Sequence, residues 1–202
     1  MKKCSVEGCT RPHEAKGYCH THYSQLKRYG EIRRTQKDKN EIVTHEDYAE
    51  IILYNRKCEE VARTQISLES VPLVKDIKWR LLKTNYVEGY HQGKFIRLNR
   101  FLMNVTKRGL EVDHIDRNPL NNRLSNLRVC NRSQNVMNTT IRVDNKYNCK
   151  GISFDKRVNK WVAKITVNKK TIHLGQSSDI DEAIRLRMKA EEKYFGEYRV
   201  KL

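Results

Sequence analysis

Residues 111–138 read EVDHIDRNPLNNRLSNLRVCNRSQNVMN and form the most polar and chemically distinctive stretch of the chain. Asp, His and Asn side chains alternate here with short apolar runs, at a density that a hydrophobic core would not tolerate. Two strands are expected at 112–115 and 127–129, separated by a turn-rich loop. Ser133 is expected to cap a helix that carries Asn135. The stretch therefore predicts a strand, a loop, a second strand and a helix.

The side chains of this stretch suit phosphodiester hydrolysis. That reaction needs a base that deprotonates water and a positive charge that stabilises the growing negative charge. A histidine suits the first task, and a carboxylate with an amide oxygen can hold a hard divalent cation. Asp113 and His114 are adjacent, however, and neighbours on a regular strand point to opposite faces. Two alternatives remain open: an asparagine-rich loop without chemistry, and a calcium loop around Asp113, Asp116 and Asn118 that lacks the usual glycine and distal glutamate.

Four polar elements follow one another along the stretch: Asp113-His114, Asn121-Asn122, Asn126-Leu127 and Asn135. Their order and spacing resemble the ββα-metal motif of the HNH nuclease family, especially the homing endonucleases of phages and introns. The resemblance implies that Asp113 and Asn135 bind one catalytic divalent ion, Mg²⁺ or Mn²⁺. It also implies that His114 is the general base, and that Asn126 braces the motif and orients the histidine.

The motif contains two arginines, and the chain departs from the family pattern at one position upstream of it. Arg123 and Arg128 flank the cluster and are expected to contact DNA phosphates. Relatives often have Leu-His-Arg where this chain has Leu98-Asn99-Arg100. Because that position lies outside the core motif, a changed local contact is expected, and not a loss of activity.

Residues 1–30 are rich in cysteine and histidine, and they favour a metal site. The expected ligands, separated by four residues in the first pair and by two in the second, are Cys4, Cys9, Cys19 and His22. Such a set can close a tetrahedral site around Zn²⁺, which would stabilise a zinc knuckle too short to fold alone. His13 and His20 are competing ligands, and His22 is preferred because one turn can present it together with the preceding cysteine. The alternative is a disordered basic tail with incidental cysteines.

The carboxy-terminal part separates its charges. Residues 146–173 contain eight Lys/Arg and one acidic residue, whereas 179–197 contain six Asp/Glu and four Lys/Arg. Three short strands are expected in the first range, with Lys164 and Thr166 on the exposed face. A helix is expected in the second, capped by acidic residues, with one apolar stripe of Ile180, Ile184, Met188 and Phe195. The basic sheet favours entry into a DNA groove.

Several sequence elements of this part follow a known pattern: Gly151-Ile152, the run from Lys160 to Ile165, Leu174-Gly175, Asp181-Glu182-Ala183 and Phe195-Gly196. They resemble the plant ethylene-response-factor (Apetala-type) DNA-binding domain, which also occurs in phage endonucleases. By position, the resemblance implies DNA-facing side chains at Lys150, Ser153, Lys164, Thr166, Thr171 and His173. The family often has arginine or tryptophan at several of these positions, so no target sequence is implied. The alternative is a generic sheet–helix domain with a solvated basic face.

Charge and composition indicate a nucleic-acid partner. The chain has 202 residues and a formal charge of +17, an excess that favours binding to phosphates through counterion release. Binding to an anionic membrane would require a basic amphipathic helix, and none is evident in the sequence. There is no run of eighteen apolar residues and no apolar segment after the first residues, so neither a transmembrane helix nor a signal peptide is expected. The expected location is the cytoplasm, that of a bacterial host cell if the protein is encoded by a phage.

The expected fold class is α+β, in a small multi-module protein. Its modules are a zinc knuckle at 1–30, a linker at 31–45, an HNH nuclease domain at 46–141 and an Apetala-type DNA-binding domain at 146–202. The nuclease domain should have a ββα-metal core, and the last module a three-stranded sheet plus a helix. Upstream of the motif we expect a strand at 47–54, a short helix interrupted at Pro72, a hairpin at 86–98 and a helix at 99–108.

The expected function is that of a site-preferring DNA endonuclease, a phage homing or nicking enzyme that acts as a monomer on double-stranded DNA. A DNA-binding regulator with an inactive nuclease motif is one alternative, and the intact motif residues disfavour it. An RNA-binding protein is a second alternative, weakened by the lack of an aromatic RNA-recognition motif.

Overall fold

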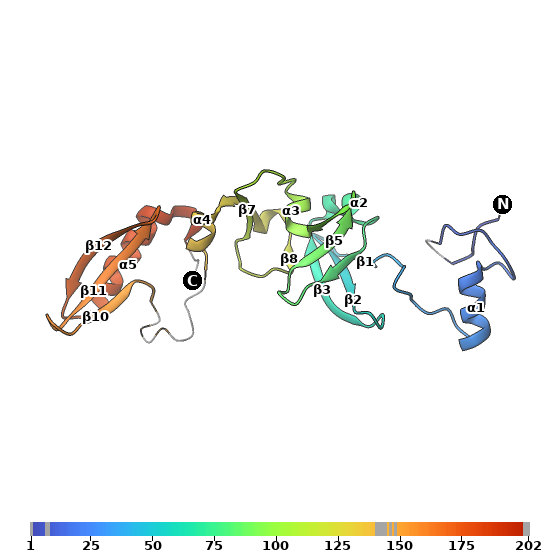
Figure 1. Cartoon of the computed structure of the whole chain (residues 1–202), viewed down its shortest axis with the longest axis horizontal. Helices are drawn as coiled ribbons and strands as arrows, with labels where there is room; N and C mark the ends of the chain where they lie inside the picture. Colours follow the sequence, from blue (N-terminus) through green and yellow to red (C-terminus); the bar gives the residue numbers. More distant parts are fainter. Residues whose placement is uncertain (1, 7–8, 140–144, 146, 148, 200–202) are drawn as a thin grey trace. The chain divides into compact units, whose positions relative to one another are not determined.

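The computed structural model describes residues 2–6, 9–139, 145, 147 and 149–199. Figure 1 follows the elements from the amino to the carboxy end. The chain forms two compact units, one of residues 1–38 with 54–60 and one of residues 39–53 with 61–202. The architecture is mixed α+β with several small sheets and few helices, as expected. Residues 142–144, at the expected boundary of the last module, lie outside the described residues.

The described part of the first unit has one helix preceded by a tightly connected loop. Helix α1 (His20–Tyr29) ends at Gly30, whose φ of 74° lets its N–H bond the carbonyl of Leu26. Before the helix, isolated bridges pair Lys3 with Pro12 and Ala15 with Tyr18. These bridges double the chain back on itself and bring its cysteines toward the start of α1.

Two sheets form the first half of the second unit and enclose its largest core. One has the order β1 (Ile42–Thr44), β2 (Ala49–Tyr54), β3 (Glu60–Ile66), β8 (Asn121–Asn122). The other has the order β4 (Trp79–Leu81), β5 (Val87–His91), β6 (Lys94–Arg97). Ile51, Leu53, Ile66 and Trp79 are almost completely buried in the core of this half. Strand β1 lies inside the range expected to be a linker.

The elements upstream of the motif follow the expectations from the sequence only in part. The expected strand and hairpin are present, whereas strands β3 and β4 were not expected. The helical segment is present as η1 (Leu68–Ser70) and α2 (Val71–Val74), but Pro72 lies in the first turn of α2 and does not interrupt it. The helix expected at 99–108 is the shorter α3 (Leu98–Leu102). Asn104 takes a φ of 50°, a left-handed conformation that cannot continue an α-helix.

The motif folds as a hairpin followed by a short helix. Strand β7 (Leu110–His114) pairs antiparallel with β9 (Leu127–Asn131), and η2 (Leu124–Asn126) and α4 (Arg132–Met137) flank β9. The cap of α4 is Asn131, and the expectation of Ser133 was wrong. Asn131 accepts from the backbone N–H of Gln134, and Gln134 accepts from that of Asn131, so a capping box starts the helix two residues earlier.

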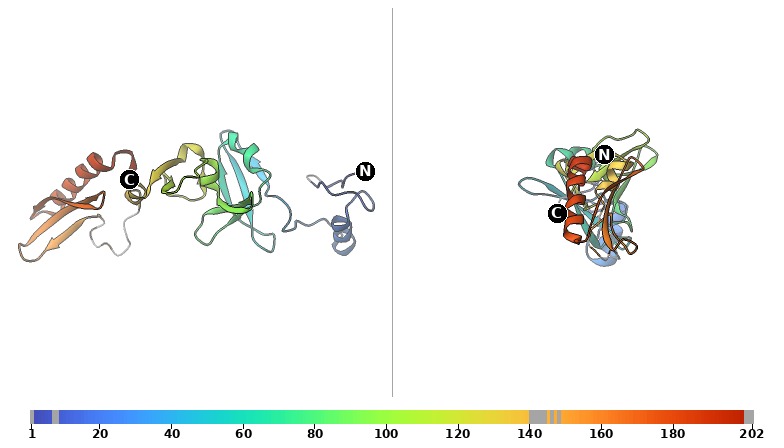
Figure 2. Two further views of the ribbon diagram at one scale, coloured as in Figure 1. Left: turned by 45° about the horizontal axis from the view of Figure 1, so that its top comes forward. Right: turned by 90° about the vertical axis from the view of Figure 1, so that its left-hand side faces the viewer.

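The carboxy-terminal part has the expected three strands and helix. They are β10 (Ile152–Asp155), β11 (Lys160–Val167), β12 (Lys170–Ser177) and α5 (Ile180–Phe195), followed by η3 (Gly196–Tyr198). Figure 2 shows α5 lying along one face of this sheet. The expected helix stripe was wrong at Met188, which is 38% exposed; Ala183, Arg187 and Ala190 are buried there instead. No helix within the described ranges is long and apolar enough to cross a membrane.

Candidate active site and metal centre

Asp113 lies near the end of β7 and is held by two neighbours. Arg128, directly opposite on β9, donates from Nε and Nη2 to its Oδ2 at 2.9 and 2.7 Å. Asn138, at the end of α4, donates from Nδ2 to both oxygens at 3.0–3.1 Å. Asp113 is 8% exposed, so the structure places a buried carboxylate between a strand and a helix.

His114 ends β7 and is almost completely buried. Its Nε2 lies 3.1 Å from Oδ1 of Asn122, and its ring packs edge-on against Tyr86. Burial lowers the pKa of His114 below its ordinary value, against the opposing effects of the Asn122 bond and of nearby carboxylates. The neutral imidazole is therefore favoured at neutral pH, which is the form that a general base requires.

Asn126 braces the backbone between the two strands. Its Oδ1 accepts from the N–H of Asp116 at 3.0 Å, and its Nδ2 donates to Asp116 Oδ1 and to the carbonyl of Asn121. Burial raises the pKa of Asp116, but hydrogen bonds from the backbone N–H of Asn118 and from the side chains of Asn126 and Asn121 outweigh it and lower the pKa overall. Asn126 thus contacts the loop that follows His114, and the imidazole ring itself bonds Asn122.

Asn135 projects from α4 toward β7. Its Nδ2 donates to Oε2 of Glu111 at 2.5 Å, and Glu111 and Asp113 alternate onto one face of the strand. The amide oxygen of Asn135 is the atom left for a cation. Two carboxylates and one amide oxygen are hard donors of the kind that Mg²⁺ prefers, so the residues present fit a divalent ion.

The two arginines of the motif differ in their surroundings. Arg128 is largely buried, pairs with Asp113, donates to the carbonyl of Glu197 and lies over the Tyr198 ring at 4.6 Å. Arg123 donates from Nε to Oδ1 of Asn121 and forms no ion pair with a carboxylate of the described residues. The guanidinium of Arg128 is therefore already satisfied within the protein.

Some residues of this cluster are not evident from the sequence. Asn138 was not singled out, although it contacts Asp113 and donates to the carbonyl of His114 at 2.9 Å. Glu111 was not singled out either. Asn99, where relatives often have histidine, is 3% exposed and donates to the carbonyl of Val112. The same-face spacing of Glu111 with Asp113 could have indicated Glu111, whereas the contact of Asn138 with Asp113 depends on where α4 ends.

The expected metal ligands of the first unit come together. Ligand atoms of Cys4, Cys9, Cys19 and His22 lie within 4.8 Å of one another, and the cluster is a possible metal site. His22 Nδ1 lies 3.2 Å from the Cys4 sulfur and 3.6 Å from the Cys19 sulfur. Burial raises the pKa of the Cys4 thiol, but hydrogen bonds from His22 and from backbone amides outweigh it and lower the pKa to about 6. A lowered thiol pKa favours the thiolate, the form that binds metal.

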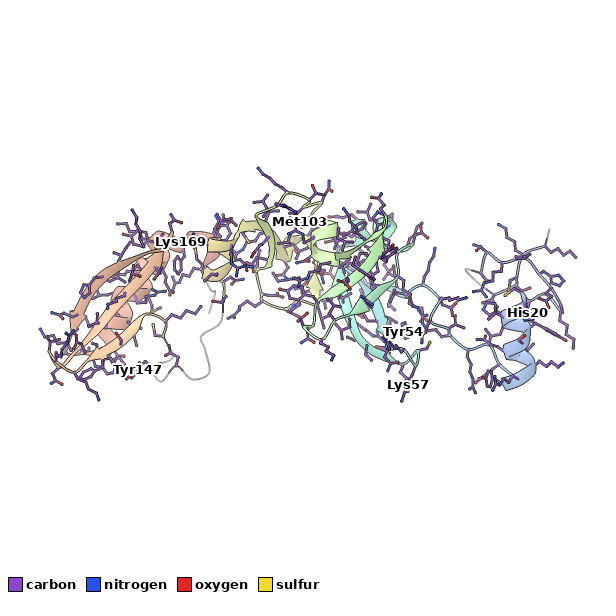
Figure 3. All side chains as sticks on the ribbon, viewed as in Figure 1. His20, Tyr54, Lys57, Met103, Tyr147 and Lys169 are labelled. Carbon is purple, nitrogen blue, oxygen red and sulfur yellow. The ribbon has the colours of Figure 1, made fainter. Side chains whose placement is uncertain are left out.

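The two competing histidines lie outside this cluster. His20, labelled in Figure 3, pairs instead with Glu14 at 2.9 Å, with a side chain 79% exposed. His13 is exposed as well. The geometry thus selects the same four residues that the spacing favoured.

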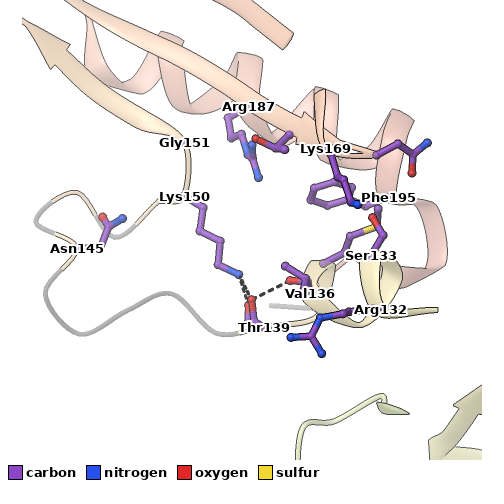
Figure 4. A pocket seen from close by; sticks show the side chains of 13 residues that line it. Arg132, Ser133, Val136, Thr139, Asn145, Lys150, Gly151, Lys169, Arg187 and Phe195 are labelled. Carbon is purple, nitrogen blue, oxygen red and sulfur yellow. Dashed lines mark hydrogen bonds between the residues drawn. The ribbon is translucent and has the colours of Figure 1, made fainter. Parts of the chain in front are cut away.

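The carboxy-terminal sheet exposes most of the expected DNA-facing side chains. Across β11 and β12, Lys164 pairs with His173 and Thr166 with Thr171, and all four are exposed, as is Ser153. Lys150 differs: it is half-buried and donates to Thr139 in the cavity of Figure 4. Burial lowers the pKa of Lys150 below its ordinary value.

Comparisons with known proteins agree with this geometry. Residues 106–137 match the HNH endonuclease family. An uncharacterized HNH endonuclease of Acanthamoeba polyphaga mimivirus is 33% identical over 138 residues, which cover 66% of this chain and 71% of that protein. Protein 3.8 of Escherichia phage T7 is 31% identical over 91 residues, 45% of this chain and 74% of that protein. No solved structure matches the chain. On this evidence the chain belongs to the HNH endonuclease family and is a nuclease, a hydrolase.

Proposed function

We propose that the chain is a DNA endonuclease that hydrolyses a phosphodiester at a preferred site, with His114 as its general base. The observation that carries the proposal is the buried histidine whose surroundings favour the neutral ring, next to a carboxylate. His114 takes a proton from water, the hydroxide attacks phosphorus, and one ester oxygen leaves. Asn126 holds the loop after His114 in place through Asp116 and the carbonyl of Asn121.

Asp113 and Asn135 would hold one Mg²⁺ or Mn²⁺. The ion supplies positive charge that stabilises the developing negative charge on the phosphate. Arg128 occupies one side of the Asp113 carboxylate, and Asn138 donates to both of its oxygens. The remaining lone pairs of the carboxylate, with Asn135 Oδ1 and the neighbouring Glu111, form the set available to a cation.

The first unit is proposed as a zinc knuckle with Cys4, Cys9, Cys19 and His22 as ligands. Three sulfurs and one imidazole nitrogen match the donor preference of Zn²⁺ in closed structural sites. Three of the four residues are buried, in a unit whose described part offers little apolar core of its own. Metal binding would therefore stabilise this unit directly.

The carboxy-terminal module is proposed as an Apetala-type DNA-binding domain. Its exposed face carries Lys164, Thr166, Thr171 and His173 in register, with Ser153 on the neighbouring strand. Arg123 would add a phosphate contact beside the nuclease motif. With one active site followed in the sequence by one module proposed to bind DNA, we propose a monomer with a homing or nicking role, in keeping with the viral origin of its relatives.

The test is cleavage of the DNA that flanks the protein's own gene. Purified protein is incubated with this DNA, end-labelled on each strand, with Mg²⁺ or with chelator, and the products are separated on a denaturing gel. We expect discrete fragments with Mg²⁺ and none with chelator. Intact DNA in every reaction, despite measurable binding, would support a DNA-binding protein without activity and contradict the proposal.

A further inference from the structure

A buried chain of hydrogen bonds joins the upstream sheet to His114. The side chain of Asn122, 1% exposed, meets His114 Nε2 through Oδ1 at 3.1 Å. Its Nδ2 donates to Thr64 Oγ1 and to the carbonyl of Pro119, both at 2.9 Å. The hydroxyl of Thr64, a residue with no exposed surface, donates to the carbonyl of Leu120 at 2.9 Å. Water cannot readily replace any of these bonds, so each lost bond leaves a buried polar group unpaired.

The direction of every bond in the chain follows from its partners. The carbonyl oxygen of Pro119 can only accept, so the nitrogen of the Asn122 amide must face it. The amide oxygen therefore faces His114, and because it also can only accept, the ring must donate from Nε2. In the neutral imidazole one nitrogen carries hydrogen and the other a lone pair. The lone pair of His114 is thus on Nδ1.

Strand pairing places the threonine at the start of this chain. Strand β8 adds in parallel to the edge of β3, with Gln65 opposite Asn121 and Ile66 opposite Asn122. The backbone N–H of Gln65 also donates to the carbonyl of Leu120, the same group that accepts from Thr64. The upstream sheet thereby fixes the loop from which Asn122 reaches the histidine.

We propose that Thr64 and Asn122 are positioning residues that hold His114 in its Nε2–H tautomer, with Nδ1 free to accept the proton of the attacking water. The catalytic part of this inference rests on the proposed role of His114 as general base. The tautomer follows from the hydrogen bonds alone. Without this support the His114 ring would sample the other tautomer and other orientations. The cleavage rate would then fall, although no contact with DNA would be lost.

Three variants separate positioning from general bracing. Thr64→Val removes the hydroxyl at constant volume, and Thr64→Ser retains it. Ser67→Ala is the matched control, because Ser67 Oγ accepts from the N–H of Leu124 across the same junction but does not reach His114. Each variant is measured for its single-turnover cleavage rate, for its DNA affinity and for the ¹⁵N shifts of its His114 ring.

We expect Thr64→Val to lose about tenfold in rate, part of the 10²–10⁴ that a general base contributes, with DNA affinity unchanged. Thr64→Ser and Ser67→Ala should cleave near the wild-type rate. In metal-free wild-type protein the ¹⁵N shifts should show a protonated Nε2 and a lone-pair Nδ1. A protonated Nδ1 would overturn the inference whether or not the protein cleaves. Full activity of Thr64→Val would overturn the catalytic part alone, and failure of wild type to cleave with Mg²⁺ would instead count against the proposed function.

Discussion

Asp113 and Arg128 form a buried ion pair within the proposed metal site. The two residues face each other across β7 and β9, with side chains 8% and 12% exposed. A guanidinium in this position offsets the carboxylate charge when no cation is bound. It also competes with a cation for the same oxygen. Arg128 therefore has a role inside the protein in addition to any contact with a phosphate.

Replacing Arg128 by methionine should separate these roles. The Arg128→Met variant leaves a buried carboxylate without its partner, so we expect stability to fall by about 3 kcal/mol in metal-free protein. Mg²⁺ should bind the variant more tightly than wild type and restore part of the loss, measured as melting temperature against Mg²⁺ concentration. Arg123→Met, which removes no partner of Asp113, is the control. If the melting temperature depends equally on Mg²⁺ concentration in wild type and in both variants, Arg128 does not compete with the ion for the Asp113 carboxylate.

The candidate site could be predicted from the sequence only where its residues are close along the chain. The spacing of Asp113, His114, Asn126 and Asn135 lies within one stretch and can be compared with a family pattern. Thr64 lies 58 positions before Asn122, and their contact depends on the parallel pairing of β3 with β8. Local periodicity carries no signal for such a pairing, because it depends on the packing of a sheet formed elsewhere.

At the scale of elements, the loop before α1 depends on metal in this account. We expect about one Zn²⁺ per chain in protein purified without chelator, and loss of that zinc with loss of α1 ellipticity in Cys4→Ser. Cys58→Ser is the control, because Cys58 lies outside the cluster. Elemental analysis that finds no zinc in wild-type protein would contradict the proposed zinc knuckle.

The residue just before β10, Gly151, occupies a position that only glycine fits. Gly151 has a φ of 72°, and a Cβ there would lie 2.2 Å from the carbonyl oxygen of Lys164. Gly151→Ala should cost about 1–2 kcal/mol in backbone strain and about 1–3 kcal/mol from the forced shift. The measurement is hydrogen exchange in the peptides of β10–β12, which should become faster.

The control for this prediction is Gly109→Ala. Gly109 has a similar φ of 84°, but a Cβ there would meet nothing within 4 Å. In Gly109→Ala only the backbone strain should act. Hydrogen exchange should therefore become faster only in the peptides around residue 109. If both variants lose the same protection from hydrogen exchange, the close contact of Gly151 with Lys164 does not contribute to the stability of the β10–β12 sheet.

The elements themselves were predictable where periodicity was strong, and their ends were not. The strands and helix of the carboxy-terminal part follow the alternation and the acidic cap at Asp179. The start of α4 differed because Asn131 and Gln134 form a reciprocal cap that outcompetes Ser133. Met188 was wrongly predicted to lie on the buried face of α5. The helix presents Ala183 and Ala190 to the sheet, and such small residues give a weak periodic signal.

At the scale of the whole molecule, the one catalytic cluster proposed among the described residues implies one cut at a time. A chain with one general base activates one water, so cutting both strands requires a second site or a second binding event. The charge of +17 also disfavours self-association at low salt. On a supercoiled plasmid with one target site, open circles should accumulate well before linear DNA. Direct appearance of linear DNA, rising steeply with protein concentration, would indicate a dimer.

The central claim is that His114 removes the proton from the attacking water. The most direct measurement is the single-turnover cleavage rate of His114→Ala with Mg²⁺, alongside its DNA affinity, with His91→Ala as a control outside the motif. The proposed mechanism predicts a cleavage rate lower by about 10²–10⁴ with DNA affinity near wild type, and an unchanged rate for the control. Cleavage by His114→Ala at the wild-type rate would contradict it.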